Sequence, residues 1–74
     1  MKLKVQLIGT FQIGRFKEDI RDYPPAASVR VVVDELRLST PLFGAVLVNG
    51  KHADFEDTLK DGDTVCILPL LGGG

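Results

Sequence analysis

The sequence is poor in the side chains that build catalytic and metal centres. Its 74 residues include one cysteine, Cys66, one histidine, His52, and no tryptophan. A four-ligand zinc site or a cysteine-ligated iron–sulfur cluster needs more such ligands than one copy of the chain contains. A single cysteine also excludes an internal disulfide, which is typical of a reducing cytoplasm. We therefore expect a carrier or a binding module without a metal site, and not a self-contained enzyme.

Runs of like charge and long apolar runs are also missing. The formal net charge is −1, and basic residues are interleaved with acidic ones, so the chain lacks the basic stretch that binds a phosphate backbone. No segment approaches the roughly 20 apolar residues that cross a bilayer. The N-terminal apolar run breaks at Gly9 without a small-residue cleavage site. These absences predict no nucleic-acid or membrane partner and a cytoplasmic location.

The first part of the chain favours two strands. Hydrophobic residues make up 45% of the sequence and charged residues 26%, the balance of a small globular domain. Residues 2–8 alternate between apolar and polar side chains, which indicates a half-buried strand. Residues 9–14 fit a loop. Residues 15–23 alternate more weakly, and there Phe16 and Ile20 could share a face of a second strand.

A helix is expected after the Pro24-Pro25 break. Ser28 stands at the N-cap position, where its hydroxyl can accept a hydrogen bond from a free N–H of the first turn. The β-branched run 31–33 favours a strand, but the complete helical spacing of the apolar residues outweighs it. Arg30 and Asp34 lie one turn apart and could pair, and Pro41 is expected to end the helix. The apolar face consists of Val29, Val32, Val33 and Leu36.

Three further strands are predicted in the second half. A strand at residues 45–48 and its return at 51–54 flank Asn49-Gly50, a dipeptide typical of tight hairpin turns. Residues 55–60 should form an irregular or 3₁₀ turn with Leu59 inward, followed by a turn at residues 61–63. In the last strand, residues 64–69, Val65 and Ile67 should face one way. The opposite side should carry Thr64, Cys66 and Leu68.

This order of elements predicts an α+β fold. One apolar sheet face must be buried, and the single helix is the element available to cover it. We therefore expect a roll in which one main helix packs across one face of a mixed sheet, formed by residues 1–69. Residues 70–74 would be a flexible C-terminal glycine tail.

The tail is the candidate chemical site. After Pro69 the chain reads Leu70-Leu71-Gly72-Gly73-Gly74, and fully extended this segment would reach roughly 17 Å. A terminal carboxylate becomes a good electrophile once it is converted to an acyl-adenylate, and glycine has no Cβ to block a narrow channel in an adenylating enzyme. Terminal glycines are also common in merely disordered chain ends, so the tail alone leaves both interpretations open.

The motifs upstream of the tail resemble a known family. Leu47-Val48-Asn49-Gly50, the segment from Leu59 to Val65, Ile67-Leu68-Pro69 and the terminal Gly73-Gly74 are similar, in order and spacing, to the molybdopterin synthase small subunits and thiamine-pathway sulfur carriers. The resemblance covers essentially the whole chain. It implies a ubiquitin-like β-grasp fold.

The same resemblance implies a function. Gly74, with Gly73, would be adenylated by a ubiquitin-activating-type partner that uses ATP, and a sulfur donor would convert it to a thiocarboxylate. The sulfur would then pass to a biosynthetic acceptor such as a molybdopterin synthase large subunit, with the thiamine pathway as the alternative. The chain itself would bind no cofactor and would act as a carrier or subunit. Partner binding would involve Leu68, Pro69, Leu70, Leu71 and Gly72.

Two other functions remain open at this point. The chain could be a ubiquitin-like modifier that is joined to other proteins through Gly74, since the chemistry is shared up to the adenylate. It could also be a β-grasp interaction module that does not use its tail. Cys66 is expected to be a packing residue rather than a sulfur-relay thiol. His52 is expected to be exposed, because no nucleophile or carboxylate accompanies it.

Overall fold

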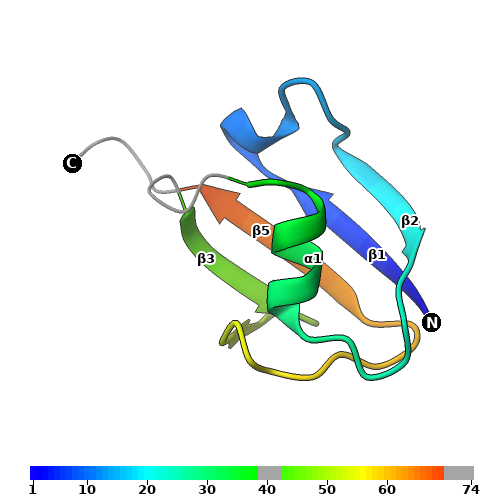
Figure 1. Ribbon diagram of the computed structural model, residues 1–74. Helices are drawn as coiled ribbons and strands as arrows, with labels where there is room; N and C mark the ends of the chain where they lie inside the picture. Colours follow the sequence, from blue (N-terminus) through cyan, green and yellow to red (C-terminus); the bar gives the residue numbers. More distant parts are fainter. Residues whose placement is uncertain (39–42, 70–74) are drawn as a thin grey trace.

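The computed structural model describes residues 1–38 and 43–69. Within them, the elements are β1 (Lys2–Leu7), the 3₁₀ helix η1 (Gly9–Gln12), β2 (Glu18–Asp22), α1 (Val29–Glu35), β3 (Phe43–Val48), β4 (Lys51–Ala53) and β5 (Thr64–Pro69). The five strands form one sheet in the order β2-β1-β5-β3-β4. Strands β1 and β5 are parallel, and the other neighbours are antiparallel. Helix α1 crosses one face of this sheet (Figure 1), which confirms the predicted β-grasp fold.

The core lies between α1 and the two central strands. Leu3, Val5 and Leu7 of β1 are fully buried, as are Val65 and Ile67 of β5. The predicted apolar face of the helix is also buried, and Leu59 points inward with 2% of its surface exposed. The period-two and helical patterns therefore identified the core-facing side of these three elements. The prediction of a helix in spite of the β-branched run is confirmed.

Strand β2 departs from the prediction. Ile20 pairs with Lys4 and is 55% exposed, so it lies on the face of the sheet away from the helix. Phe16 instead packs against the core from the segment before β2. The two residues do not share a face, because pairing with β1 decides the phase of β2, and β2 begins only at Glu18. The expected loop at residues 9–14 contains η1, whose Phe11 is buried.

The start of the helix also differs in its contacts. Ser28 is the N-cap residue, as predicted, but its side chain makes no capping hydrogen bond. The N–H of Val29 donates to the carbonyl of Asp57 at 3.0 Å, and the N–H of Arg30 donates to the carbonyl of Phe55 at 2.8 Å. Backbone carbonyls of a neighbouring segment thus accept hydrogen bonds from the free N–H groups of the first turn, where a serine hydroxyl is the usual acceptor.

Arg30 likewise has a different partner from the expected one. Its Nε donates to Oε1 of Glu56 at 2.6 Å, and its guanidinium lies over the Phe55 ring. Segment 55–58 lies against the start of α1 because Thr58 forms an isolated bridge with Ser28. The pairing with Asp34 expected from helical spacing was therefore wrong, since a more distant segment of the chain competes for the same cation.

The turn at the end of β3 is linked to the turn before β5. Asn49 and Gly50 have φ values of 53° and 83°, which confirms the predicted tight hairpin. The Asn49 side chain donates to Oδ1 of Asp63 at 2.9 Å and accepts from the Thr64 N–H at 3.0 Å. Two motifs separated in sequence are thereby joined, and this contact aligns the beginning of β5 with the end of β3.

The helix ends earlier than expected. Its last residue is Glu35, and Arg37 adopts a left-handed φ of 54°. The Arg37 N–H donates to the Asp34 carbonyl at 3.1 Å, and the Leu38 N–H donates to the Val33 carbonyl at 3.3 Å. This is a Schellman motif, in which glycine is the usual residue at the left-handed position. The motif ends the helix, whereas Pro41, the expected stop, lies outside the described residues.

Replacing this left-handed arginine should stabilise the protein. Arg37→Gly removes the steric penalty of a side chain at positive φ but retains the backbone carbonyl that accepts from Arg15 Nη2. We expect the free energy of unfolding to rise by about 0.5–1 kcal/mol, measured by chemical denaturation. Arg30→Gly, inside the helix, is the control and should lower it. A loss of stability in Arg37→Gly would contradict this interpretation of the helix end.

Candidate functional site

Strand β5 carries the described residues nearest in sequence to the tail. Val65 and Ile67 are fully buried beneath α1, and Thr64, Cys66 and Leu68 are half-buried on the opposite face. This alternation confirms the predicted facing of the strand. Helix α1 covers the other side of the sheet (Figure 1), so Leu68 lies on the uncovered side, directly before the residues that lead to Gly74.

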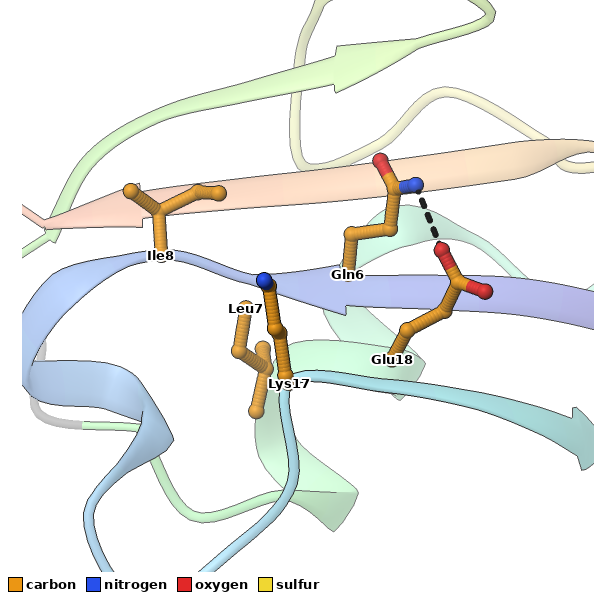
Figure 2. A pocket seen from close by; sticks show the side chains of 5 residues that line it. All are labelled: Gln6, Leu7, Ile8, Lys17 and Glu18. Carbon is orange, nitrogen blue, oxygen red and sulfur yellow. Dashed lines mark hydrogen bonds between the residues drawn. The ribbon is translucent and has the colours of Figure 1, made fainter.

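Apolar side chains from three strands gather around Leu68. Leu68 pairs with Ala45 of β3, and Cys66 pairs with Leu47. On the other side of β5, Ile8 continues β1, is 38% exposed, and its N–H donates to the Ile67 carbonyl. Ile8 and Gln6 point to the side of β1 opposite Leu7 (Figure 2). We call Ile8, Ala45, Leu47, Cys66 and Leu68 the outer patch.

A hollow with a mixed lining adjoins this patch. It has a volume of about 430 Å³ and is lined by Gln6, Leu7, Ile8, Lys17 and Glu18. The Gln6 side chain donates to Oε1 of Glu18 at 2.9 Å, across β1 and β2 (Figure 2). Ile8 therefore belongs to the outer patch and also lines this hollow, whose rim carries the basic Lys17 and the acidic Glu18. A mixed surface of this kind, apolar at its centre and polar at its rim, is typical of protein–protein contacts.

Cys66 and His52 do not form a catalytic pair. Leu47 separates them on the outer face, because it pairs with Cys66 on one side and with His52 on the other. Strands lie about 4.8 Å apart, so the two residues are roughly 10 Å from each other. Burial raises the pKa of the Cys66 thiol, which makes it a poorer nucleophile. His52 is exposed, as expected.

The described part of the chain brings together no set of metal-ligating side chains. Across residues 1–38 and 43–69, His, Cys, Asp and Glu side chains form no group of three that could hold an ion. None of the helices described there is long and apolar enough to span a membrane.

The remaining predicted site residues divide into two groups. Pro69 is buried, with its ring against Gly9 and its carbonyl beside Gly44, so its side chain offers less surface than Leu68 does. Leu70, Leu71, Gly72, Gly73 and Gly74 lie outside the described residues. The division into a domain at 1–69 and a flexible tail at 70–74 therefore stays a prediction, as does the role of each tail residue.

Sequence reasoning missed most of the outer patch. Ile8 could have been found, because it is the last residue of the predicted strand at 2–8 and is in phase with Lys4 and Gln6. Ala45 and Leu47 could not, because their position depends on the register of β3 against β5. That register contains a bulge between Phe43 and Ala45, of which Gly44, a glycine within the strand, is the local sign.

The model of the ThiS family matches residues 5–74. The match spans nearly all of the chain and includes the motifs around Asn49, Asp63 and the terminal glycines. The chain belongs to the ThiS family. No curated protein matches this ThiS-family sequence.

Solved structures of related proteins share the fold. A putative molybdopterin converting factor subunit 1 from Pyrococcus furiosus is 26% identical, with coverage of 96% of this chain and 99% of that one and a TM-score of 0.78. Small archaeal modifier protein 1 of H. volcanii is 21% identical, with coverage of 95% and 98% and a TM-score of 0.77. A chain from the complex of molybdopterin-converting factor subunits 1 and 2 of Helicobacter pylori is 23% identical over the full length of both chains, with a TM-score of 0.68.

The thiol of this ThiS-family chain should react slowly. Because burial raises the Cys66 pKa, the thiolate is scarcer at any given pH than in an exposed cysteine, whose pKa is about 8.5. The rate of alkylation by iodoacetamide, measured against pH, should have its midpoint above that of glutathione. The unfolded chain in denaturant is the control and should behave as a free thiol. A midpoint below that of glutathione would contradict the packing role of Cys66.

Proposed function

We propose that the protein is a sulfur carrier that acts through Gly74. The observation that carries this proposal is the match of the ThiS family to residues 5–74, which includes the terminal glycines. The outer patch supports it, since an uncovered apolar surface next to the tail is where an enzyme that grips the tail would dock. The chain would bind no cofactor, and the activating partner would use ATP.

The proposed chemistry takes place on the terminal carboxyl group. A carboxylate oxygen of Gly74 attacks the α-phosphorus of ATP in the partner enzyme, and pyrophosphate leaves. The sulfur of a sulfide-level donor then attacks the acyl carbon, and AMP leaves with the electron pair of the broken C–O bond. The product is a thiocarboxylate, and its sulfur is transferred to a biosynthetic acceptor. Glycine at both terminal positions lets the backbone enter a narrow adenylation channel.

The nature of the acceptor is a finer part of the proposal. The Helicobacter pylori relative is described in a complex of two molybdopterin-converting factor subunits, and the Pyrococcus furiosus relative is a putative subunit 1. We therefore favour a molybdopterin synthase large subunit as the acceptor. The similarity to small archaeal modifier protein 1 motivates the second candidate, a protein modifier joined through Gly74.

Intact-mass analysis should detect the thiocarboxylate directly. The full chain is incubated with an adenylating enzyme of the ubiquitin-activating type, ATP and a sulfide donor. We expect the mass to increase by the replacement of one oxygen with one sulfur. The matched control lacks Gly73 and Gly74 and should stay unchanged, because its new terminus ends short of the adenylation site.

The mass measurement also separates a carrier from a modifier. Isopeptide adducts on lysines without sulfur exchange would favour a modifier over a carrier. A separate assay of cofactor synthesis tests the interaction module: if the chain without Gly73 and Gly74 supports synthesis as well as the full chain does, the protein is an interaction module and the carrier proposal is wrong.

A charge in the outer patch should weaken binding of the activating enzyme. Leu68→Asp places a carboxylate among Ile8, Ala45 and Cys66, where a docked partner would desolvate it. We expect the dissociation constant to rise at least about tenfold, a change of about 1.4 kcal/mol. The measurement is isothermal titration calorimetry with the adenylating enzyme.

A matched variant on the same strand serves as the control. Thr64→Asp lies on the same face of β5 but at its opposite end, beside Lys4, and should bind with nearly the wild-type affinity. Both variants should retain the wild-type circular dichroism spectrum, because neither side chain is part of the core. Equal affinity of Leu68→Asp and wild type would remove the outer patch from the proposal.

A further inference from the structure

The last residue of β5 lies against a bulge in β3. Phe43 pairs with Pro69 and Ala45 pairs with Leu68, so Gly44 is an extra residue on the β3 side. β5 lies between β1 and β3, where proline is unfavourable because it cannot donate to the ladder. A bulge is one of the few places within a sheet that accept proline. Pro69 ends the strand with its ring against Gly9, beyond the last residue of β1 at Leu7, so no β1 residue needs its missing N–H, while the bulge at Gly44 faces its carbonyl group.

Gly44 is required there because a Cβ would clash with neighbouring backbone atoms, and not because of its backbone conformation. A Cβ at this position would lie 2.5 Å from the Pro69 carbonyl oxygen, 2.8 Å from the Pro69 carbonyl carbon and 3.0 Å from the Leu68 carbonyl oxygen. All three atoms belong to the backbone, so no side-chain rotation relieves the contact. The φ of Gly44 does not lie in the left-handed region, so an alanine would fit the local conformation and clash only with β5.

A second glycine contacts Pro69 from the side of β1. Gly9 has a φ of 58°, and a Cβ there would lie 3.3 Å from Cγ of Pro69. Pro69 is buried between the two glycines, and its ring restricts its own φ to about −65°. The backbone of the residue that precedes the tail is therefore held between the start of η1 and strand β3. We call Gly9, Gly44 and Pro69 the exit clamp.

We propose that the exit clamp is a positioning element, which determines the direction in which the chain continues toward Gly74. The inference rests on the proposed function for its consequence: the clamp sets where and at what angle the tail leaves the domain, and a partner docked on the outer patch must receive the tail from that point. Displacement of a reacting group by about 1 Å can reduce a rate about 100-fold. Gly44 and Gly9 would thus influence adenylation without contacting any reactant.

The first test measures direction in the isolated chain and needs no enzyme. Residual dipolar couplings of the Leu70 and Leu71 N–H groups are compared between the wild type and Gly44→Ala. We expect these couplings to change, since the added Cβ must displace the carbonyl groups of Leu68 and Pro69, while couplings in β1 stay the same. Unchanged couplings at Leu70 and Leu71 would overturn the proposal whatever the function of the protein.

The second test measures adenylation as ATP–pyrophosphate exchange at varied carrier concentration. Gly44→Ala should lower kcat about tenfold and leave KM for the carrier within about threefold, because docking and alignment are separate steps. A purely structural defect would instead reduce the amount of folded carrier and raise the apparent KM. A wild-type chain that is not adenylated refutes the proposed function, whereas equal kcat values refute only the clamp.

The control must lose stability without touching Pro69. Gly14 has a φ of 72°, and a Cβ added to it would meet no heavy atom within 4 Å, so Gly14→Ala introduces backbone strain only. It should retain the wild-type kcat and the wild-type couplings. If Gly44→Ala does not fold, Pro69→Ala replaces it in the test. This variant removes the restriction on φ at residue 69 and the ring contact with Gly9, and it introduces no clash. The same fall in kcat is expected, and a wild-type kcat would overturn the proposal.

Discussion

The fold depends on covering one face of a five-stranded sheet with one short helix. Helix α1 has seven residues, and its buried valines lie against the alternating residues of β1 and β5. A domain of this size has only enough apolar surface for one such core. In the part of the chain that the structure describes, no helix covers the opposite face of the sheet.

The parallel pairing of β1 with β5 gives that open face its character. It places the first and last strands of the sheet side by side, with Leu7 opposite Ile67. Ile8, from the beginning of the sequence, then borders the same surface as Leu68, near its end. Apolar residues that are isolated in sequence thereby become one patch, and the patch lies where the chain continues to the tail.

The described side chains hold the end of β5 and form the outer patch. In the proposed function, the reactive side chains belong to the partner enzymes. Partial burial raises the pKa of the Cys66 thiol, and His52 is two strands away from it. What the domain offers instead is an apolar surface and a firmly held last strand residue. Under the proposed function, a chain with so few reactive side chains would take part in group transfer through its backbone terminus.

Local patterns in the sequence determined the strands β1 and β5, the helix, the Asn49-Gly50 turn and the side of each that faces the core, because alternation and helical spacing act over a few residues. The tertiary structure alone decided the contacts between distant segments. Arg30 pairs with Glu56 instead of Asp34, the helix start is capped by backbone at 55–57, and Ile20 turns outward. The bulge at Gly44 and the exit clamp arise in the same way, because they depend on how closely β3, β5 and the start of η1 approach, which only packing sets.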